Sequence, residues 1–284
     1  MKVITNIIKF IIITILTICM ISIGIITIVS STILDQSYIT QKLEETNFYS
    51  ETYELVKSNF ENYIYQSGLD ENVLTDICPK EKVKQDLNII LSNIYLGTNE
   101  KIDTTEIANN LNANIDKLGI KNSKNEKAIN QFVEHICNEY TDTLIHTKYE
   151  ENINTMYNKI TVGLNKLYNI AVIILVVAII ILVIMNIKKS SKNIQNIGIA
   201  LFATSIFNLI ACNIVKTKVN IQGIKIFNDT FSKAIVTIIQ DVLEKITSLG
   251  VGALVVSILL ILIYAMIIAS KKSEDKKEEK TIDK

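Results

Sequence analysis

The sequence is poor in the residues that many enzymes use for catalysis. It has no arginine, two histidines and a single proline among its 284 residues. No Ser-His-Asp order, phosphate-binding glycine loop or paired CxxC motif stands out. Carboxylates are plentiful, but nothing in the sequence places two of them in one pocket, so the sequence gives no support for an enzyme. The absence of arginine beside abundant Lys, Asn and Ile indicates an AT-rich genome as the source, and no function.

Charge is also missing from four long stretches of the chain. Each of them lacks Asp, Glu, Lys and Arg altogether. At 1.5 Å per residue even the shortest run reaches about 31 Å, which is enough to cross a hydrocarbon core of about 30 Å. We therefore predict an all-α membrane protein with four transmembrane helices. The four spans are residues 10–34, 167–187, 194–215 and 247–270.

The spans contain small and polar residues in place of charged ones. An ion-coupled transporter usually carries ionisable groups inside the membrane, and their absence argues against that class. Small residues at every fourth position let helix backbones approach, and Asn208 can form a hydrogen bond across a helix interface. The predicted packing residues are Ala200, Thr204, Asn208, Cys212, Ala253 and Ser257.

The distribution of lysines predicts which ends lie in the cytoplasm. Lysines in residues 1–9, before the first span, are typical of an uncleaved signal anchor; cleavage after Ser30 or Ser31 is the alternative. The loop 188–193 and the tail 271–284 are also rich in lysine, which places both termini in the cytoplasm by the positive-inside rule. Lysines outnumber acids in residues 216–246, and this leaves the inverted topology open. We expect a multi-pass protein of the plasma membrane.

Residues 35–166 are predicted to form an acidic, extracytoplasmic helical domain between the first and second spans. They contain 21 acidic residues and 13 lysines, a net charge of −8, which argues against nucleic acid as a partner. Residues 216–246 form a second extracytoplasmic segment, whose amphipathic helix runs into the fourth span. Residues 271–284 alternate Lys with acidic residues, and we predict a disordered tail.

Helix start and stop signals occur throughout the outer domain. One predicted helix has apolar positions from Phe48 to Ile64 and ends at Gly68, and a second runs from Pro79 to Gly97. Residues 103–106 and 123–126 match capping boxes for a third helix, ending near Gly119, and a fourth. Beyond Glu126 the helical pattern continues to Ile187, apart from polar residues around 146–154.

One polar stripe of the outer domain could bind a metal ion. His135, Glu139, Asp142 and His146 lie within about 60° of one another on a helix. Four ligands spread along about 16 Å cannot share one ion, so only a pair such as His135 with Glu139 is realistic. Because an apolar face lies elsewhere on this helix, the stripe is adequately explained as the solvated side, and we predict no cofactor.

Two cysteines, Cys78 and Cys137, lie in the same outer domain. An oxidising exterior would permit a disulfide between them, worth about 4 kcal/mol in the chain-entropy model. The sequence does not show whether their Cα atoms approach, so free thiols remain the alternative.

Three segments of the outer domain resemble a known family. They are QSGLDENVLTDI (66–77), VKQDLNIILSNIYLG (83–97) and IDTTEI (102–107), behind an anchor that is followed by Tyr38-Ile39. They look like a family of uncharacterised multi-span membrane proteins from low-GC Gram-positive bacteria. The resemblance implies plasma-membrane placement and supports the domain boundary, but it implies no activity, cofactor or catalytic residue.

The sequence therefore favours a non-enzymatic envelope protein that is anchored in the membrane and displays a helical interaction domain. Its expected partners are the lipid bilayer and another membrane or envelope protein. One alternative is a sensor or regulatory subunit of a membrane complex, in which outer contacts shift the long helices that enter the second and fourth spans. A membrane-embedded enzyme or transport accessory is the other alternative.

Overall fold

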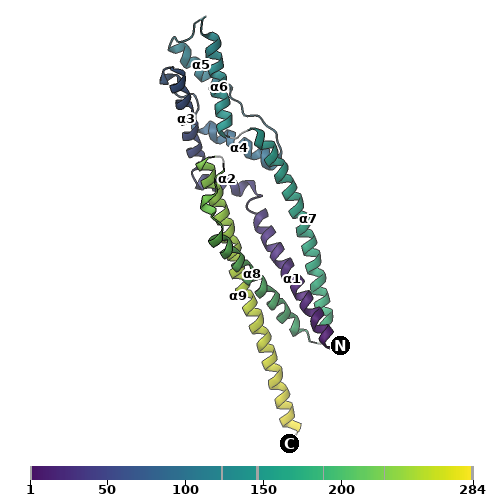
Figure 1. Ribbon diagram of the computed structural model, residues 1–284. Coiled ribbons are helices and arrows are strands. Elements are labelled where there is room, and N and C mark those ends of the chain that lie inside the picture. The colour runs from purple at the N-terminus through teal and green to yellow at the C-terminus, as the bar shows by residue number, and fades with distance from the viewer. Residues whose placement is uncertain (1, 123, 145–146, 188, 227, 283–284) are drawn as a thin grey trace. The chain divides into compact units, whose positions relative to one another are not determined.

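The computed structural model of the chain is built of helices (Figure 1). It describes residues 2–122, 124–144, 147–187, 189–226 and 228–282. Within these ranges there is no β-strand, and the only extended pairing is an isolated bridge between Ile226 and Asn228. The predicted all-α class is confirmed.

The chain divides into two compact units. The first, here called the membrane unit, comprises Met1–Ser31, Val162–Gly223 and Ile239–Lys284. The second, here called the helical unit, comprises Thr32–Thr161 and Ile224–Ile238. Two long helices, α7 and α9, each contribute residues to both units.

Four helices are long and apolar enough to cross a membrane, as the sequence predicts. They are α1 (Lys2–Ser30), α7 (Thr147–Met185), α8 (Ser191–Lys218) and α9 (Asp229–Ile282). The first predicted run extends to Leu34, but α1 ends at Ser30 because residues 31–34 form a turn before Asp35 caps the next helix. A short 3-10 helix, η2 (Ile221–Gly223), follows α8.

Helices α1 and α8 pack closely within the membrane unit. The Thr204 hydroxyl on α8 lies 3.4 Å from the Thr17 carbonyl on α1, and the Thr17 hydroxyl lies 3.5 Å from the Ala200 carbonyl. Such contacts require small side chains at the crossing. The buried apolar residues of this core are Ile12, Leu16, Ala178, Leu182 and Ala200. Elsewhere on these helices many large apolar side chains are exposed. Such a surface is unfavourable in water, and lipid would cover it.

The helical unit is built from short helices around one apolar core. Its elements are α2 (Gln36–Glu45), α3 (Phe48–Ser67), η1 (Glu71–Leu74), α4 (Lys80–Leu96), α5 (Thr105–Lys117) and α6 (Glu126–Leu144). Gly68, Gly97 and Gly119 have φ of 71°, 69° and 65°, the left-handed conformation that ends a helix. These three predicted stops are confirmed. Helix α6 ends at Leu144 and α7 begins at Thr147, so residues 147–154, where polar residues suggest an interruption, are helical, and residues 145–146 lie outside the described residues.

The helix starts differ from the predicted capping boxes. Helix α5 begins at Thr105, and Asp103 Oδ1 accepts a hydrogen bond from the Thr105 amide at 2.9 Å. This hydrogen bond reaches only two residues along the chain. In a capping box the side chain accepts from the amide three residues further on, so the capping box predicted at residues 103–106 is wrong. For the second box, Ser123 lies outside the described residues. Next to it the Asn122 amide donates to Asn125 Oδ1 at 2.7 Å, which organises the start of α6.

The first turns of α9 belong to the helical unit. Ala234 and Ile238 are buried in its core, and the Phe231 ring lies edge-on against Phe48 with 4.8 Å between centroids. Lys233 forms an ion pair with Glu51 on α3. The sequence predicts 216–246 as one separate segment, and the structure instead divides it between the two units.

At its other end α9 continues as helix to Ile282, so the predicted disorder is wrong for residues 271–282, and residues 283–284 lie outside the described residues. Lys and Glu are good helix formers, and residues 271–282 contain no glycine or proline. The helix that spans residues 247–270 therefore has no stop signal after its apolar part.

Candidate functional site

A cavity of about 350 Å³ opens on the helical unit between α3 and the segment that contains η1. Buried apolar side chains form its inner wall, and charged residues lie around its mouth. The wall includes the buried Val56, Phe60 and Ile77 and the half-buried Leu74.

The mouth of this cavity carries net negative charge. Glu61, Glu71 and Asp76 are exposed there, and the one lysine, Lys57, lies 3.9 Å from Glu61. Asp76 has φ of 52°, a left-handed conformation that Asp adopts more readily than most residues. We call these residues, with the apolar wall, the acidic cavity. The arrangement suits a ligand that combines positive charge with an apolar part.

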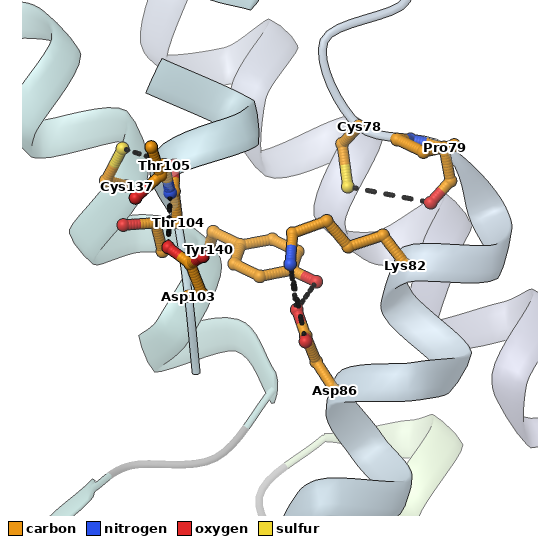
Figure 2. Close-up of polar contacts among 9 residues, drawn as sticks. All are labelled: Cys78, Pro79, Lys82, Asp86, Asp103, Thr104, Thr105, Cys137 and Tyr140. Carbon is orange, nitrogen blue, oxygen red and sulfur yellow. Dashed lines mark hydrogen bonds and ion pairs between the residues drawn. The ribbon is translucent and has the colours of Figure 1, made fainter. Parts of the chain in front are cut away.

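A buried network of polar side chains links α4 to α6 (Figure 2). Lys82 Nζ lies 3.0 Å from Asp86 Oδ2, and the Tyr140 hydroxyl donates to the same oxygen at 2.5 Å. The exposed fractions are 8% for Lys82, 3% for Asp86 and 0% for Tyr140. Each charged group in the network therefore has a close partner, which a buried charge requires.

The sequence places these groups together for a local reason. Lys82 and Asp86 are four residues apart, so they lie one turn apart on the same side of α4. Val83 and Leu87 follow them directly and are buried, which carries the charged pair into the core. The sequence analysis missed this pair. Its signal was a Lys and an Asp at helical spacing beside an apolar stripe, together with a tyrosine on the apolar face of α6.

Cys78 belongs to both the acidic cavity and the network. Its side chain lines the cavity, and burial raises the pKa of its thiol to about 12, although the Lys82 ammonium acts in the opposite direction. Burial and the hydrogen bond to Asp86 also raise the pKa of Tyr140 well above its usual range. At neutral pH both groups keep their protons. A protonated thiol is a poor nucleophile. The contacts of Lys82 and Tyr140 with Asp86 join α4 to α6.

The two outer cysteines are not bonded to one another. All four cysteines are free, and the Sγ atoms of Cys78 and Cys137 lie 3.9 Å from the carbonyls of Pro79 and Thr104, respectively. Figure 2 shows the two thiols on opposite sides of the Tyr140 ring. The structure therefore adopts the free-thiol alternative in place of the disulfide.

The predicted metal stripe lies on α6 as expected. His135 and Asp142 are exposed, Glu139 is half-buried, and the His135 ring stacks at a tilt on Tyr63 with 5.8 Å between centroids. His146 lies outside the described residues. Among those described, no three His, Cys, Asp or Glu side chains come together to hold a metal ion. The pair His135 and Glu139 stays a prediction.

The predicted packing residues of the membrane unit lie mostly inside it. Buried ones are Ala200, Thr204, Asn208, Cys212 and Ser257, while Ala253 is half-buried. The predicted hydrogen bond from Asn208 across a helix interface is not formed, because neither side-chain atom of Asn208 has a partner within the described residues. Asn208 instead packs beside Gly250 of α9.

Comparison with known proteins adds no relative. No protein-family model matches the chain, and neither a curated protein nor a solved structure is significantly similar to it. The resemblance to a low-GC Gram-positive family thus stays a prediction, and the case for function depends on the geometry.

Proposed function

We propose that the chain is a non-enzymatic, multi-pass protein of the plasma membrane, with both termini in the cytoplasm. Its helical unit lies outside the cytoplasm, and the acidic cavity binds a basic segment of another envelope protein. The observation that carries this proposal is the acidic cavity itself, a recess with an apolar wall and a negatively charged mouth.

The chain segments that form the helical unit support the proposed topology. Residues 32–161 and 224–238 share one core, so both must lie on the same side of a bilayer. Helices α7 and α8 separate these segments, and two crossings return the chain to the side from which it left. Crossings by α1 and α9 then put both termini on the opposite side, where lysine-rich residues favour the cytoplasm.

The charge of the helical unit supports a basic partner. Residues 35–166 carry a net charge of −8, and three carboxylates surround the cavity beside one lysine. Complementary charge accelerates encounter and selects partners, while apolar contacts supply most of the affinity. A Lys or Arg side chain, or a basic helix end, would place its aliphatic stem on Val56 and Phe60.

Topology is tested by labelling single cysteines in intact cells with a reagent that cannot cross the membrane. In a background without native cysteines, Tyr65→Cys should react from outside, because the Tyr65 side chain is 87% exposed on the helical unit. Ser190→Cys, between α7 and α8, should react only after permeabilisation. The reverse pattern would refute the proposed orientation, and reaction of both from outside would refute the span arrangement.

Partner binding is tested by photo-crosslinking from the mouth of the cavity. A crosslinking residue at Thr75 should capture a protein that the same residue at Asp116, exposed on α5, does not. Capture should fall when Glu61, Glu71 and Asp76 are changed together to Gln, Gln and Asn. If capture is equal from both positions, or is unchanged by the triple variant, the cavity is not the binding site.

A sensor or regulatory subunit is the second candidate, and the continuity of two helices favours it. Both α7 and α9 run without interruption from residues of the helical unit into residues of the membrane unit. A ligand that binds one conformation of the helical unit better would shift the population of the whole chain. This role requires an output protein in the membrane, so mild solubilisation followed by co-purification should recover one, and recovery of none would count against it.

A further inference from the structure

A groove of about 490 Å³ runs along the surface of the membrane unit between α1 and α8. Its lining is mainly apolar, and Phe10 and Ile199 are exposed along it. The hydroxyls of Thr14 and Thr17 donate to carbonyls one turn back at 3.0 Å and 2.9 Å, so a hydrocarbon chain can cover them without breaking a hydrogen bond.

The length of the groove matches one leaflet of a bilayer. Its lining on α1 extends from Asn6 to Thr17, which is about 17 Å of helix. Half of a hydrocarbon core is about 15 Å. An acyl chain that enters at Asn6 would therefore reach the bilayer midplane near Thr17.

One end of the groove is polar and fixed in position. Lys9 Nζ donates to Asn186 Oδ1 at 2.5 Å, and Asn186 Nδ2 donates to Asn193 Oδ1 at 2.7 Å. Asn186 is buried, so this chain of hydrogen bonds holds the ammonium at the end of the groove. The bond to Asn186 uses one of the three protons of the ammonium, and two remain for another acceptor.

More positive charge lies beside this end. Lys189 lies in the turn that joins Asn186 to α8, and Lys192 lies in the first turn of α8. The sequence has no Asp or Glu in residues 1–34 or 152–228, so α1, α8 and the apolar part of α7 provide no counterion. A phosphate would add negative charge beside these lysines.

We propose that this groove is a binding site for an anionic phospholipid. The acyl chain lies between α1 and α8, and the phosphate contacts Lys9, with Lys189 and Lys192 beside it. Basic recesses between transmembrane helices suit such headgroups. The inference requires that the four helices lie in a bilayer, but it does not depend on which side faces the cytoplasm, so failure of the orientation test would leave it intact.

The test is native mass spectrometry of the full chain, released from detergent that contains equal amounts of phosphatidylglycerol and phosphatidylcholine. Wild-type protein should retain phosphatidylglycerol in preference. Lys9→Gln should weaken this retention about fivefold, as expected for one lysine near a membrane surface. Lys218→Gln, at the far end of α8, is the matched control and should retain the lipid as wild type does.

Lys9 also forms a hydrogen bond with Asn186, so Lys9→Gln could weaken the fold as well as lipid binding. A second variant distinguishes the two effects. Ala203→Phe fills the groove without a change of charge and should displace the lipid. Millimolar inorganic phosphate should not compete, because it lacks the chain that the groove holds. The proposal would be overturned if the wild-type protein retained both lipids equally. It would also be overturned if Lys9→Gln and Ala203→Phe both retained phosphatidylglycerol as wild type does, or if inorganic phosphate alone displaced the lipid.

Discussion

The hydroxyl of Tyr140 on α6 donates a 2.5 Å hydrogen bond to Oδ2 of Asp86 on α4, inside the core of the helical unit. The same oxygen lies 3.0 Å from Lys82 Nζ, so one carboxylate accepts from a neutral and a charged donor. A buried ion pair often contributes little net stability, but a buried carboxylate that loses a donor is costly. Removal of one member of the network should therefore lower the stability of the helical unit.

Replacement of Tyr140 by Phe tests the value of this bond. Tyr140→Phe keeps the ring and removes the donor, and we expect the free energy of unfolding of the helical unit to fall by about 1–3 kcal/mol. Tyr65→Phe removes an exposed hydroxyl and should have little effect. Denaturant titration of the detergent-solubilised chain, followed by circular dichroism, measures both. An equal effect of the two variants would show that the hydrogen bond adds nothing.

Alkaline pH should destabilise the helical unit. Burial raises the pKa of Cys78 to about 12, and the pKa of Tyr140 is also raised, so the folded state keeps protons that the unfolded state releases. Groups with raised pKa stabilise fully below their unfolded values, near 9 for Cys and 10 for Tyr, and lose that contribution as pH rises further. Denaturant midpoints should fall between pH 9 and 12. Cys78→Ala should reduce this fall, and an unchanged slope would contradict the burial of the thiol.

The sequence predicted the helical class, the four spans and the glycine stops, because uncharged runs and chain breakers act locally. It did not predict that residues 224–238 join the core of residues 32–161, since the contact of Phe231 with Phe48 joins segments about 180 positions apart. The acidic cavity and the contact of Tyr140 with Asp86 were missed for the same reason. Each needs side chains from two helices or from a helix and a loop, and helical spacing reveals only those that share a helix.

The state of the cysteines offers a direct check on the structure. Because Cys78 and Cys137 lie against different carbonyls, denatured protein that has never been reduced should take up four equivalents of iodoacetamide. In the native state Cys137, which is half-buried, should react before Cys78, which is buried and holds its proton. Mass spectrometry counts the modified sites. An uptake of two equivalents would establish the disulfide that the structure lacks.

Gly250 and Gly252 of α9 form a matched pair for testing the packing of the membrane unit. A Cβ at Gly250 would lie 3.2 Å from the Leu209 side chain and 3.4 Å from Asn208 Cβ, whereas a Cβ at Gly252 would meet nothing within 4 Å. Both substitutions to Leu raise helix propensity equally, so any difference between them reports crowding against α8. Gly250→Leu should unfold more easily in detergent than Gly252→Leu, by about 1–3 kcal/mol, the usual cost of overpacking. Equal stability of the two variants would mean that α8 and α9 do not pack at Gly250 in the solubilised protein.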